Sequence, residues 1–444
     1  MSPKPNEYAF PLRIRDYAAA PLPCMEEWKT LWKAWDLVTT KMIPAEALME
    51  QPIPLRNPLK FYVGHIPTLA TGLPPTDPAS YAQYFERGID PDVDDPSQCH
   101  DHSELPTVWP DLGEMLDYRD KVKGRIRSMY DTGRAYGERR IGRALWIGYE
   151  HEGESYSSLH LETFLYMTIL SPNIKPPPGI PRPDFESMAQ DAASARVENE
   201  WFRIPEQELT IGYQDPESDD GPNRFFAWDN EREPYDVRVP AFEAKARPVC
   251  VGEFAAFLVG TGRQEAIPAT WVRRQATLPD RGNALQTFVS QHGIRTVWGP
   301  IPLSQALDWP AMASYDDMTM YCAWLGGGVR IPTLHQVRSI HEFSDRRRAK
   351  SSSSSEKNKT AHTEPEAIFS DLDGANVGLQ NFHPVPVTHK GATLCGLGDL
   401  GGAWEWSSTP FAPQPGFKPM AIYPGYSGEF LSHPSLNRGE RGYE

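Results

Sequence analysis

The sequence is poor in cysteine, and its few cysteines are not grouped. There is no Cys-x-x-Cys pair and the total is odd, the positions being Cys24, Cys99, Cys250, Cys322 and Cys395. A zinc ribbon or a disulfide framework needs closely or evenly paired cysteines, so neither is expected. The pattern fits a protein of the reducing cytoplasm, which is the location we expect.

Long hydrophobic runs and excess positive charge are also lacking. No stretch of 18 apolar residues occurs, so no membrane span is expected, and the N-terminus has no apolar segment typical of a secretory signal. Lysine and arginine total 44 against 59 aspartate and glutamate residues, a net charge of −15. Nucleic acid and anionic lipid both attract positive charge, so neither is expected as a partner.

What the chain does have is length, proline and tryptophan. Its 444 residues leave room for two or three domains, each with its own core. The 44 prolines and 13 tryptophans predict many turns and aromatic-lined surfaces rather than long regular elements.

Helical periodicity dominates the first half of the chain. Tryptophan, leucine and valine recur at intervals of three and four from Trp28 to Val38, which predicts an amphipathic helix starting near Met25. The acidic, proline-rich stretch 77–109 is predicted to be irregular. Further helices are predicted over 57–68, 112–136 and 144–167, with the last ended by the prolines that begin at Pro172.

The segment 144–167 carries His151 and His160 among apolar residues and carboxylates. A histidine in an apolar stripe must be neutral, hydrogen-bonded or bound to a metal, because burying its charged form is costly. A pair of structural histidines is one interpretation. The other adds His65 from the helix over 57–68, because three imidazoles from two helices of a bundle can hold a divalent metal and leave positions open.

The spacing of the two later histidines constrains the metal hypothesis. His151 and His160 are nine residues apart, and at about 100° per residue an unbroken helix would point them to opposite sides. Both can face one ion only if residues 153–158 leave the helix as a loop. Glycine and serine in that stretch allow a loop.

The second half shows short strands and helices without long periodic runs. Residues 201–213 and 237–242 alternate like strands, whereas 187–196 and 253–258 have helical patterns. The basic cluster 345–350 runs into five serines and is predicted to be a solvated linker. The wider stretch 346–365 is predicted to be a disordered insertion.

Several sequence words resemble the ergothioneine-biosynthesis sulfoxide synthases. They are Trp-Asp-Leu-Val-Thr (35–39), Phe-Tyr-Val-Gly-His-Ile-Pro-Thr (61–68), the acidic stretch 85–104, Leu-Trp-Ile-Gly-Tyr-Glu-His-Glu-Gly (145–153) and Leu-His-Leu-Glu-Thr-Phe-Leu-Tyr-Met (159–167). Trp-Asp-Asn-Glu (228–231), Arg-Ile-Pro-Thr (330–333) and Trp-Glu-Trp (404–406) resemble the sulfatase-modifying, formylglycine-generating type of domain.

The resemblance implies an α+β protein in two parts. A DinB-like four-helix bundle over 23–185, preceded by an N-terminal extension over 1–22, comes first. A C-type-lectin-like, formylglycine-generating-enzyme-like domain with little regular structure follows over 186–444. Family members continue beyond the point where this chain stops, so that domain is expected to be C-terminally truncated.

The resemblance also implies the chemistry. Non-haem iron(II), Fe(2+), would be bound by His65, His151 and His160, and the substrates would be hercynine, O2, and either cysteine or a γ-glutamyl-cysteine-like thiol. A tyrosine, Tyr426 in preference to Tyr423, would donate a proton to reduced oxygen.

Two further implications concern the substrate pocket and a partner. One or more aromatic side chains would hold the trimethylammonium group of hercynine, the candidates being Trp404, Trp406, Phe411 and Tyr423. Because the methyltransferase region that usually precedes these parts is absent, a separate histidine methyltransferase is a candidate partner.

Two alternatives stay open from the sequence. The family spaces its second and third histidines four apart, so the wider spacing here and the early C-terminus also fit a catalytically inactive member that acts as a binding or structural module. A DinB-type metal-dependent thiol transferase is a third reading, although it would not need the second half of the chain.

Overall fold

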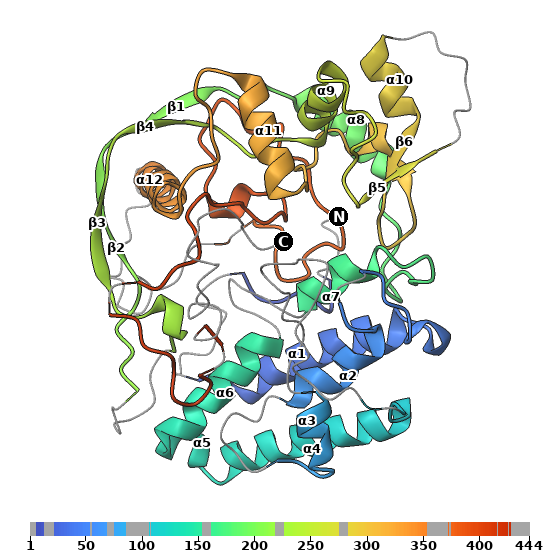
Figure 1. Ribbon diagram of the computed structural model, residues 1–444, viewed down its shortest axis with the longest axis vertical. Coiled ribbons are helices and arrows are strands. Elements are labelled where there is room, and N and C mark those ends of the chain that lie inside the picture. Colours follow the sequence, from blue (N-terminus) through green and yellow to red (C-terminus); the bar gives the residue numbers. More distant parts are fainter. Residues whose placement is uncertain are drawn as a thin grey trace.

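The structure of the chain is a computed structural model that describes residues 6–12, 22–53, 56–68, 75–85, 106, 108–152, 161–217, 226–274, 283–352, 372, 374–414, 416–424 and 426–427. Figure 1 shows a helical part formed by the first half of the chain and a second part with small sheets and further helices. The protein is therefore a mixed helix-and-sheet chain, as expected. In the part of the chain that is described, no helix combines the length and apolar character needed to cross a membrane.

The helical part begins with the predicted tryptophan-rich helix. Helix α1 (Met25–Asp36) buries Trp28, Leu31 and Trp35, and the backbone N–H of Cys24 donates to the Glu27 carboxylate at its N-terminus, 2.5 Å away. It continues as a π-helical turn over Leu37–Lys41. The other helices of this part are α2 (Leu59–Thr68), α3 (Ser80–Tyr84), α4 (Leu112–Asp131), α5 (Arg134–Gly137), α6 (Arg139–Glu152) and α7 (Leu161–Thr168).

Two sequence predictions for this part need correction. Helix α3 lies inside the stretch predicted to be irregular, because Tyr81 packs against Tyr118 of α4 and against Phe85, the C-cap residue of α3. The apolar segment 144–167 belongs to two helices, α6 and α7, rather than to one. The loop predicted over 153–158 lies outside the described residues.

Within its described residues, the second part contains three small antiparallel sheets. Strands β1 (Trp201–Ile204) and β4 (Phe242–Lys245) form one pair, β2 (Gln207–Ile211) and β3 (Tyr235–Val239) form another, and β5 (Trp271–Arg273), β6 (His292–Ile294) and β7 (Ile301–Pro302) form a three-stranded sheet. Its helices are α8 (Phe185–Ala195), α9 (Val251–Gly260), α10 (Ala284–Ser290), α11 (Tyr315–Leu325) and α12 (Leu334–Ser352).

Helix α12 overturns part of the linker prediction. It runs through the basic cluster and into the first serines, and Arg346 pairs with Glu342 one turn earlier, 2.5 Å away. The basic cluster at 345–350 is therefore helical, and so is the start of the predicted insertion at 346–352. Residues 353–365 lie outside the described residues.

Each part has its own hydrophobic core. Buried residues from Tyr8 to Met167 form the first, and buried residues from Phe185 to Tyr321 form the second. The first core also takes in Leu379 and Phe382 from the second half of the chain. The domain boundary near residue 185 stays a prediction.

The N-terminal segment fastens the two parts together on one side. Residues 6–12, which lie within the predicted N-terminal extension over 1–22, contribute Tyr8 and Phe10 to the first core. The backbone N–H of Phe10 donates to the carbonyl of Gly378 (2.9 Å), and the Asn6 side chain donates to the carbonyl of Leu379 (2.7 Å).

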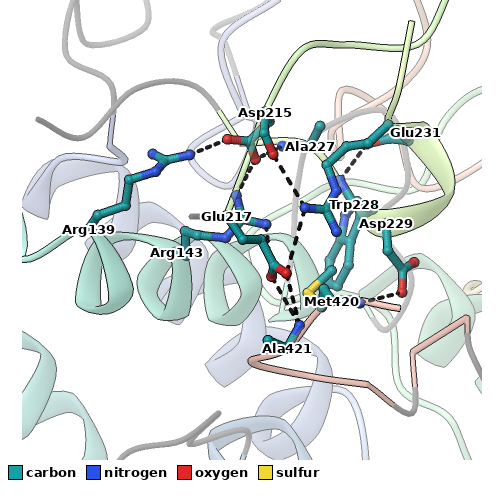
Figure 2. A network of polar contacts seen from close by, with 11 residues as sticks. Arg139, Arg143, Asp215, Glu217, Ala227, Trp228, Asp229, Glu231, Met420 and Ala421 are labelled. Atoms are coloured by element: carbon teal, nitrogen blue, oxygen red, sulfur yellow. Dashed lines mark hydrogen bonds and ion pairs between the residues drawn. The ribbon is translucent and has the colours of Figure 1, made fainter. Parts of the chain in front are cut away.

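A buried ion-pair cluster joins the parts on another side (Figure 2). Arg139 and Arg143, one turn apart on α6, both donate to the carboxylate of Asp215, and all three side chains are at most 5% exposed. Asp215 also accepts the backbone N–H of Ala227, 3.1 Å away. The first turns of α6 are thus bound to the stretch between β2 and β3 of the second part.

Replacing Asp215 with alanine tests how much this cluster stabilises the fold. Two buried guanidinium groups would lose their carboxylate, so the free energy of unfolding should fall by about 3–5 kcal/mol. Urea denaturation measures the change, and Glu206→Ala is the matched control because Glu206 forms a solvent-exposed pair with Arg238. A loss for Asp215→Ala no larger than that of the control would show that the cluster does not hold the parts together.

Candidate functional site

Two of the three candidate metal-binding histidines lie side by side. His65 is on α2 and His151 is in the last turn of α6, and both are buried, at 3% and 5% exposed. Their ring centroids are 5.0 Å apart and the ring planes make an angle of 68°. Residues from two helices therefore converge on one point of the helical core.

His65 is held in a defined tautomer. Its Nδ1 lies 2.6 Å from the backbone carbonyl oxygen of Phe85, so Nδ1 carries the proton and Nε2 carries the lone pair. Its ring stacks on Phe61 at 5.0 Å. Gly64 allows Phe85 to lie this close to α2, since a Cβ at position 64 would lie 2.5 Å from the Phe85 ring. A carbonyl bonded to Nδ1 is the arrangement commonly found behind a metal-binding imidazole.

Both imidazoles are neutral at physiological pH. Burial lowers the pKa of His65 from 6.5 to about 4. Burial, and then the neighbouring His65, lower the pKa of His151 well below its ordinary value. A metal ion would therefore find two deprotonated nitrogen ligands without having to displace protons.

The spacing of the two rings fits a shared metal ion. A ring nitrogen about 2.1 Å from a divalent metal places its ring centroid about 3.2 Å from the ion. Two rings bound at roughly 90–110° then have centroids about 4.5–5.2 Å apart. The observed 5.0 Å falls in that range.

The third candidate ligand cannot be placed. His160 lies outside the described residues, between the end of α6 at Glu152 and the start of α7 at Leu161. Among the described residues, no group of three or more His, Cys, Asp or Glu side chains is arranged to hold a metal. The ligand set His65, His151 and His160 stays a prediction.

The two candidate tyrosines lie beside the helix that carries His151. Tyr426 stacks on Trp228 with ring centroids 3.9 Å apart, and both pack in a small hydrophobic cluster with Ile147. Ile147 precedes His151 by one turn of α6. Tyr423 is half-buried at the edge of the same cluster, 6.1 Å from the Tyr426 ring.

The environment of Tyr426 keeps its phenol protonated. Burial first, and then the carboxylates of Glu231, Asp229 and Glu150, raise its pKa well above the ordinary value. A phenol that resists ionisation can serve as a proton donor at neutral pH. That role stays a prediction for Tyr426 and for Tyr423.

A buried cluster of ionisable side chains beside His151 was not predicted. The carboxyl of Glu152 is 5% exposed, and burial raises its pKa to about 8. It lines a small cavity of about 20 Å³ together with Lys123 and Arg119, which is room for about one water. The sequence held one signal of this cluster: Lys123 occupies an inward-facing position of α4, whose periodicity is otherwise ordinary.

Trp35, which also lines that cavity, restrains the end of α6. Its indole N–H donates to the backbone carbonyl of Glu152, 2.6 Å away and buried. The carbonyls of a last helical turn have no partner within the helix, so this bond satisfies one of them. It also restrains the backbone next to His151.

The four candidate aromatic residues for the substrate pocket differ in exposure. Trp404 is the most open, at 63% exposed, and its indole N–H donates to Glu162 of α7, 3.1 Å away. Trp406 is half-buried and donates to the carbonyl of Ala313. Phe411 is 38% exposed.

The comparison with known proteins identifies the family. The model of the sulfatase-modifying factor enzyme 1-like domain matches residues 193–442, more than half of the chain. The chain belongs to this family.

Relatives from ergothioneine biosynthesis extend the comparison to the helical part. Ergothioneine biosynthesis protein 1 of Neurospora crassa is 41% identical over 96% of this chain and 55% of its own length. The protein of that name from Schizosaccharomyces pombe is 28% identical over 93% of this chain and 51% of its own length. Hercynine oxygenase of Mycolicibacterium thermoresistibile is 31% identical over 46% of this chain and 44% of its own length. The resemblance expected from the sequence words is confirmed, and the chain spans about half the length of the relatives it matches.

The lowered pKa of His65 predicts a pH-dependent stability for the metal-free protein. Between pH 6.5 and about 4 the unfolded chain binds a proton that the folded chain does not, so stability falls as the pH falls through this window. His65 alone accounts for up to about 3 kcal/mol of the decrease.

Urea denaturation in the presence of a chelator, at pH 7 and at pH 4.5, measures this dependence. The His65→Gln variant should lose less stability between the two pH values than the parent protein, because glutamine has no proton to gain. An equal loss in both proteins would show that His65 is not buried as a neutral ring.

Proposed function

We propose that this chain carries the oxygenase part of an ergothioneine-biosynthesis enzyme: an iron(II)-dependent, O2-using sulfoxide synthase that joins a cysteine thiol to hercynine. The names of its relatives support the pathway. The single structural observation that supports a metal-dependent reaction is the pair of buried, neutral imidazoles of His65 and His151 with 5.0 Å between their centroids.

We further propose a domain assignment for the two parts. Residues 23–185 would form a DinB-like four-helix bundle, supported by the common core of α1, α2, α4 and α6. Residues 186–444 would form the sulfatase-modifying-enzyme-like domain, supported by the family match over 193–442. A cytoplasmic location is also proposed, supported by five cysteines that are not grouped in the sequence.

In this proposal His65, His151 and His160 hold Fe(2+). When bound there, the iron supplies open coordination positions at which a thiol and O2 can meet. The carbonyl of Phe85 holds the His65 ring with Nε2 directed away from that bond, and the Trp35 indole restrains the backbone at the end of α6. Both contacts reduce the freedom of the imidazoles before any metal binds.

The reaction balances without a further reductant. The thiol loses its S–H hydrogen and the imidazole of hercynine loses one C–H hydrogen, while the new C–S bond forms. One oxygen atom of O2 ends on the sulfur as the sulfoxide, and the other leaves as water with the two hydrogens. The Tyr426 hydroxyl would pass a proton to oxygen and take one back, with Tyr423 as the alternative donor.

The exposed ring of Trp404 is the candidate contact for the trimethylammonium group. A quaternary ammonium cannot donate hydrogen bonds and is held best by ring faces. The bond from Trp404 to Glu162 places this ring against α7, whose first residue follows His160. Free cysteine is the thiol we favour over a γ-glutamyl-cysteine-like one, and a separate histidine methyltransferase would supply hercynine.

Iron binding and oxygen uptake test the proposal together. Purified anaerobically with iron(II), the protein should bind one iron per chain and consume O2 only when thiol and hercynine are both present. His65→Gln and His151→Gln should each lose most of the iron and lower the rate of uptake by at least about 100-fold, because an open site needs all of its ligands.

The matched control is His292→Gln. His292 is also buried, and its Nδ1 likewise lies 2.7 Å from a backbone carbonyl, that of Phe288, but it belongs to β6 in the second part. Iron content and uptake should match the parent protein. Failure of the parent protein to bind iron would reject the proposal and leave a binding or structural module as the reading.

A further inference from the structure

The segment that carries Tyr426 has no regular structure of its own to position it. The tyrosine loop, defined here as residues 420–424 and 426–427, contains no helix or strand in the described residues. Two of its backbone N–H groups donate to carboxylates from elsewhere: Met420 to Asp229 at 3.2 Å, and Ala421 to Glu217 at 3.0 Å (Figure 2). Side chains of another loop therefore determine where this loop lies.

The Tyr426 ring is placed by Trp228. The two rings are stacked, 3.9 Å apart with an angle of 23° between their planes, and Trp228 is 3% exposed. Phe226 packs edge-on against Trp228 at 5.2 Å, and Ile147 of α6 lies in the same cluster. The indole is thus enclosed between the tyrosine and the helix that carries His151.

Trp228 itself is bound to α6 through a chain of polar contacts. Its backbone N–H donates to the side chain of Glu231 at 3.0 Å. The preceding N–H, that of Ala227, donates to Asp215, which is held by Arg139 and Arg143. These contacts therefore fix the position of the indole relative to α6. His151 lies on the same helix, about three turns after Arg139.

The chemistry of the tryptophan indicates a role for its ring rather than for its N–H group. Within the described part of the chain, Trp228 Nε1 is buried and has no hydrogen-bond partner. A buried N–H without a partner is unfavourable, so phenylalanine would avoid that penalty while keeping an aromatic face. Tryptophan and phenylalanine share a flat ring on which Tyr426 can stack.

We propose that Trp228 and Asp229 are positioning residues for the Tyr426 hydroxyl: Trp228 fixes the plane of the phenol, and Asp229 fixes the loop that bears it. The kinetic consequence rests on the proposed function, whereas the placement of the ring does not. A proton donor contributes about 10²–10⁴-fold to a rate, and displacing such a group by about 1 Å can remove much of that contribution.

Steady-state kinetics of the full chain with iron(II) provide the first test. Trp228→Leu should lower kcat for C–S bond formation by about 10–100-fold while leaving iron content and the KM for the thiol unchanged. Trp228→Phe should keep most of the activity. Adding Trp228→Leu to Tyr426→Phe should cause no further loss, because the indole would act only through the phenol.

The second pair of variants concerns the loop. Asp229→Leu removes the acceptor for the Met420 N–H, whereas Asp229→Asn keeps a carbonyl oxygen there, so only the leucine variant should lower kcat. A kcat within twofold of the parent for Trp228→Leu and for Asp229→Leu would overturn the proposal. So would a full additional loss in the Trp228→Leu, Tyr426→Phe double variant.

A spectroscopic measurement separates this proposal from the enzymatic one. With 3-fluorotyrosine at position 426, the ring current of a stacked indole shifts the fluorine resonance. Trp228→Leu should move that resonance, and Trp228→Phe should move it less. The control is Trp324→Leu, whose ring contacts are Phe257 and Tyr321.

The two measurements fail independently. A shifted resonance in a protein without oxygenase activity would support the placement of Tyr426 and reject the proposed function. A resonance that does not respond to Trp228→Leu would overturn the positioning role whether or not the protein is active.

Discussion

The arrangement of the two parts depends on one helix and the buried charges at its start. Arg139, Arg143, Ile147 and His151 follow one another at intervals of four residues on α6, so they form a slowly turning stripe along one side. The two arginines neutralise Asp215 in a place that water does not reach. Removing Asp215 would leave both buried guanidinium groups without their shared carboxylate, so this contact tolerates little variation in geometry.

Because the same stripe continues to Ile147 and His151, the ion pairs and the candidate metal site share one rigid element. Ala227, whose N–H donates to Asp215, directly precedes Trp228, which packs with Ile147 and Met420 in one cluster. The ion pairs at the start of α6 are therefore linked to the aromatic side chains that lie against Ile147, one turn before His151.

Local patterns predicted the long helices of the first half well. The spacing of Trp28, Trp32 and Trp35 is a property of the helix itself, so α1 could be placed before its partners were known. Helix α3 is five residues long and depends on Tyr81 packing against distant rings, so no local pattern indicated it. In α12 the run of serines suggested a linker, whereas the pairing of Arg346 with Glu342 shows that charged residues there line a solvated helix.

The candidate site was predictable to the extent that single residues carried it. His65 and His151 could be named because each stands in an apolar stripe within a recognisable word, and their proximity followed from expecting two packed helices. The stack of Trp228 on Tyr426 joins residues almost 200 positions apart. Neither periodicity nor spacing indicates a contact of that kind, and the same holds for Asp215 and its two arginines.

The attachment of residues 6–12 has a consequence for the order in which the chain matures. Asn6 bonds to Leu379, 373 residues later. At about 5–20 residues per second, a ribosome needs roughly 20–75 s to make the stretch between them. Throughout that interval Tyr8 and Phe10 can pack on the newly made helices, but their backbone partners do not yet exist. Residues 6–12 are thus secured only after the chain around Leu379 has been made.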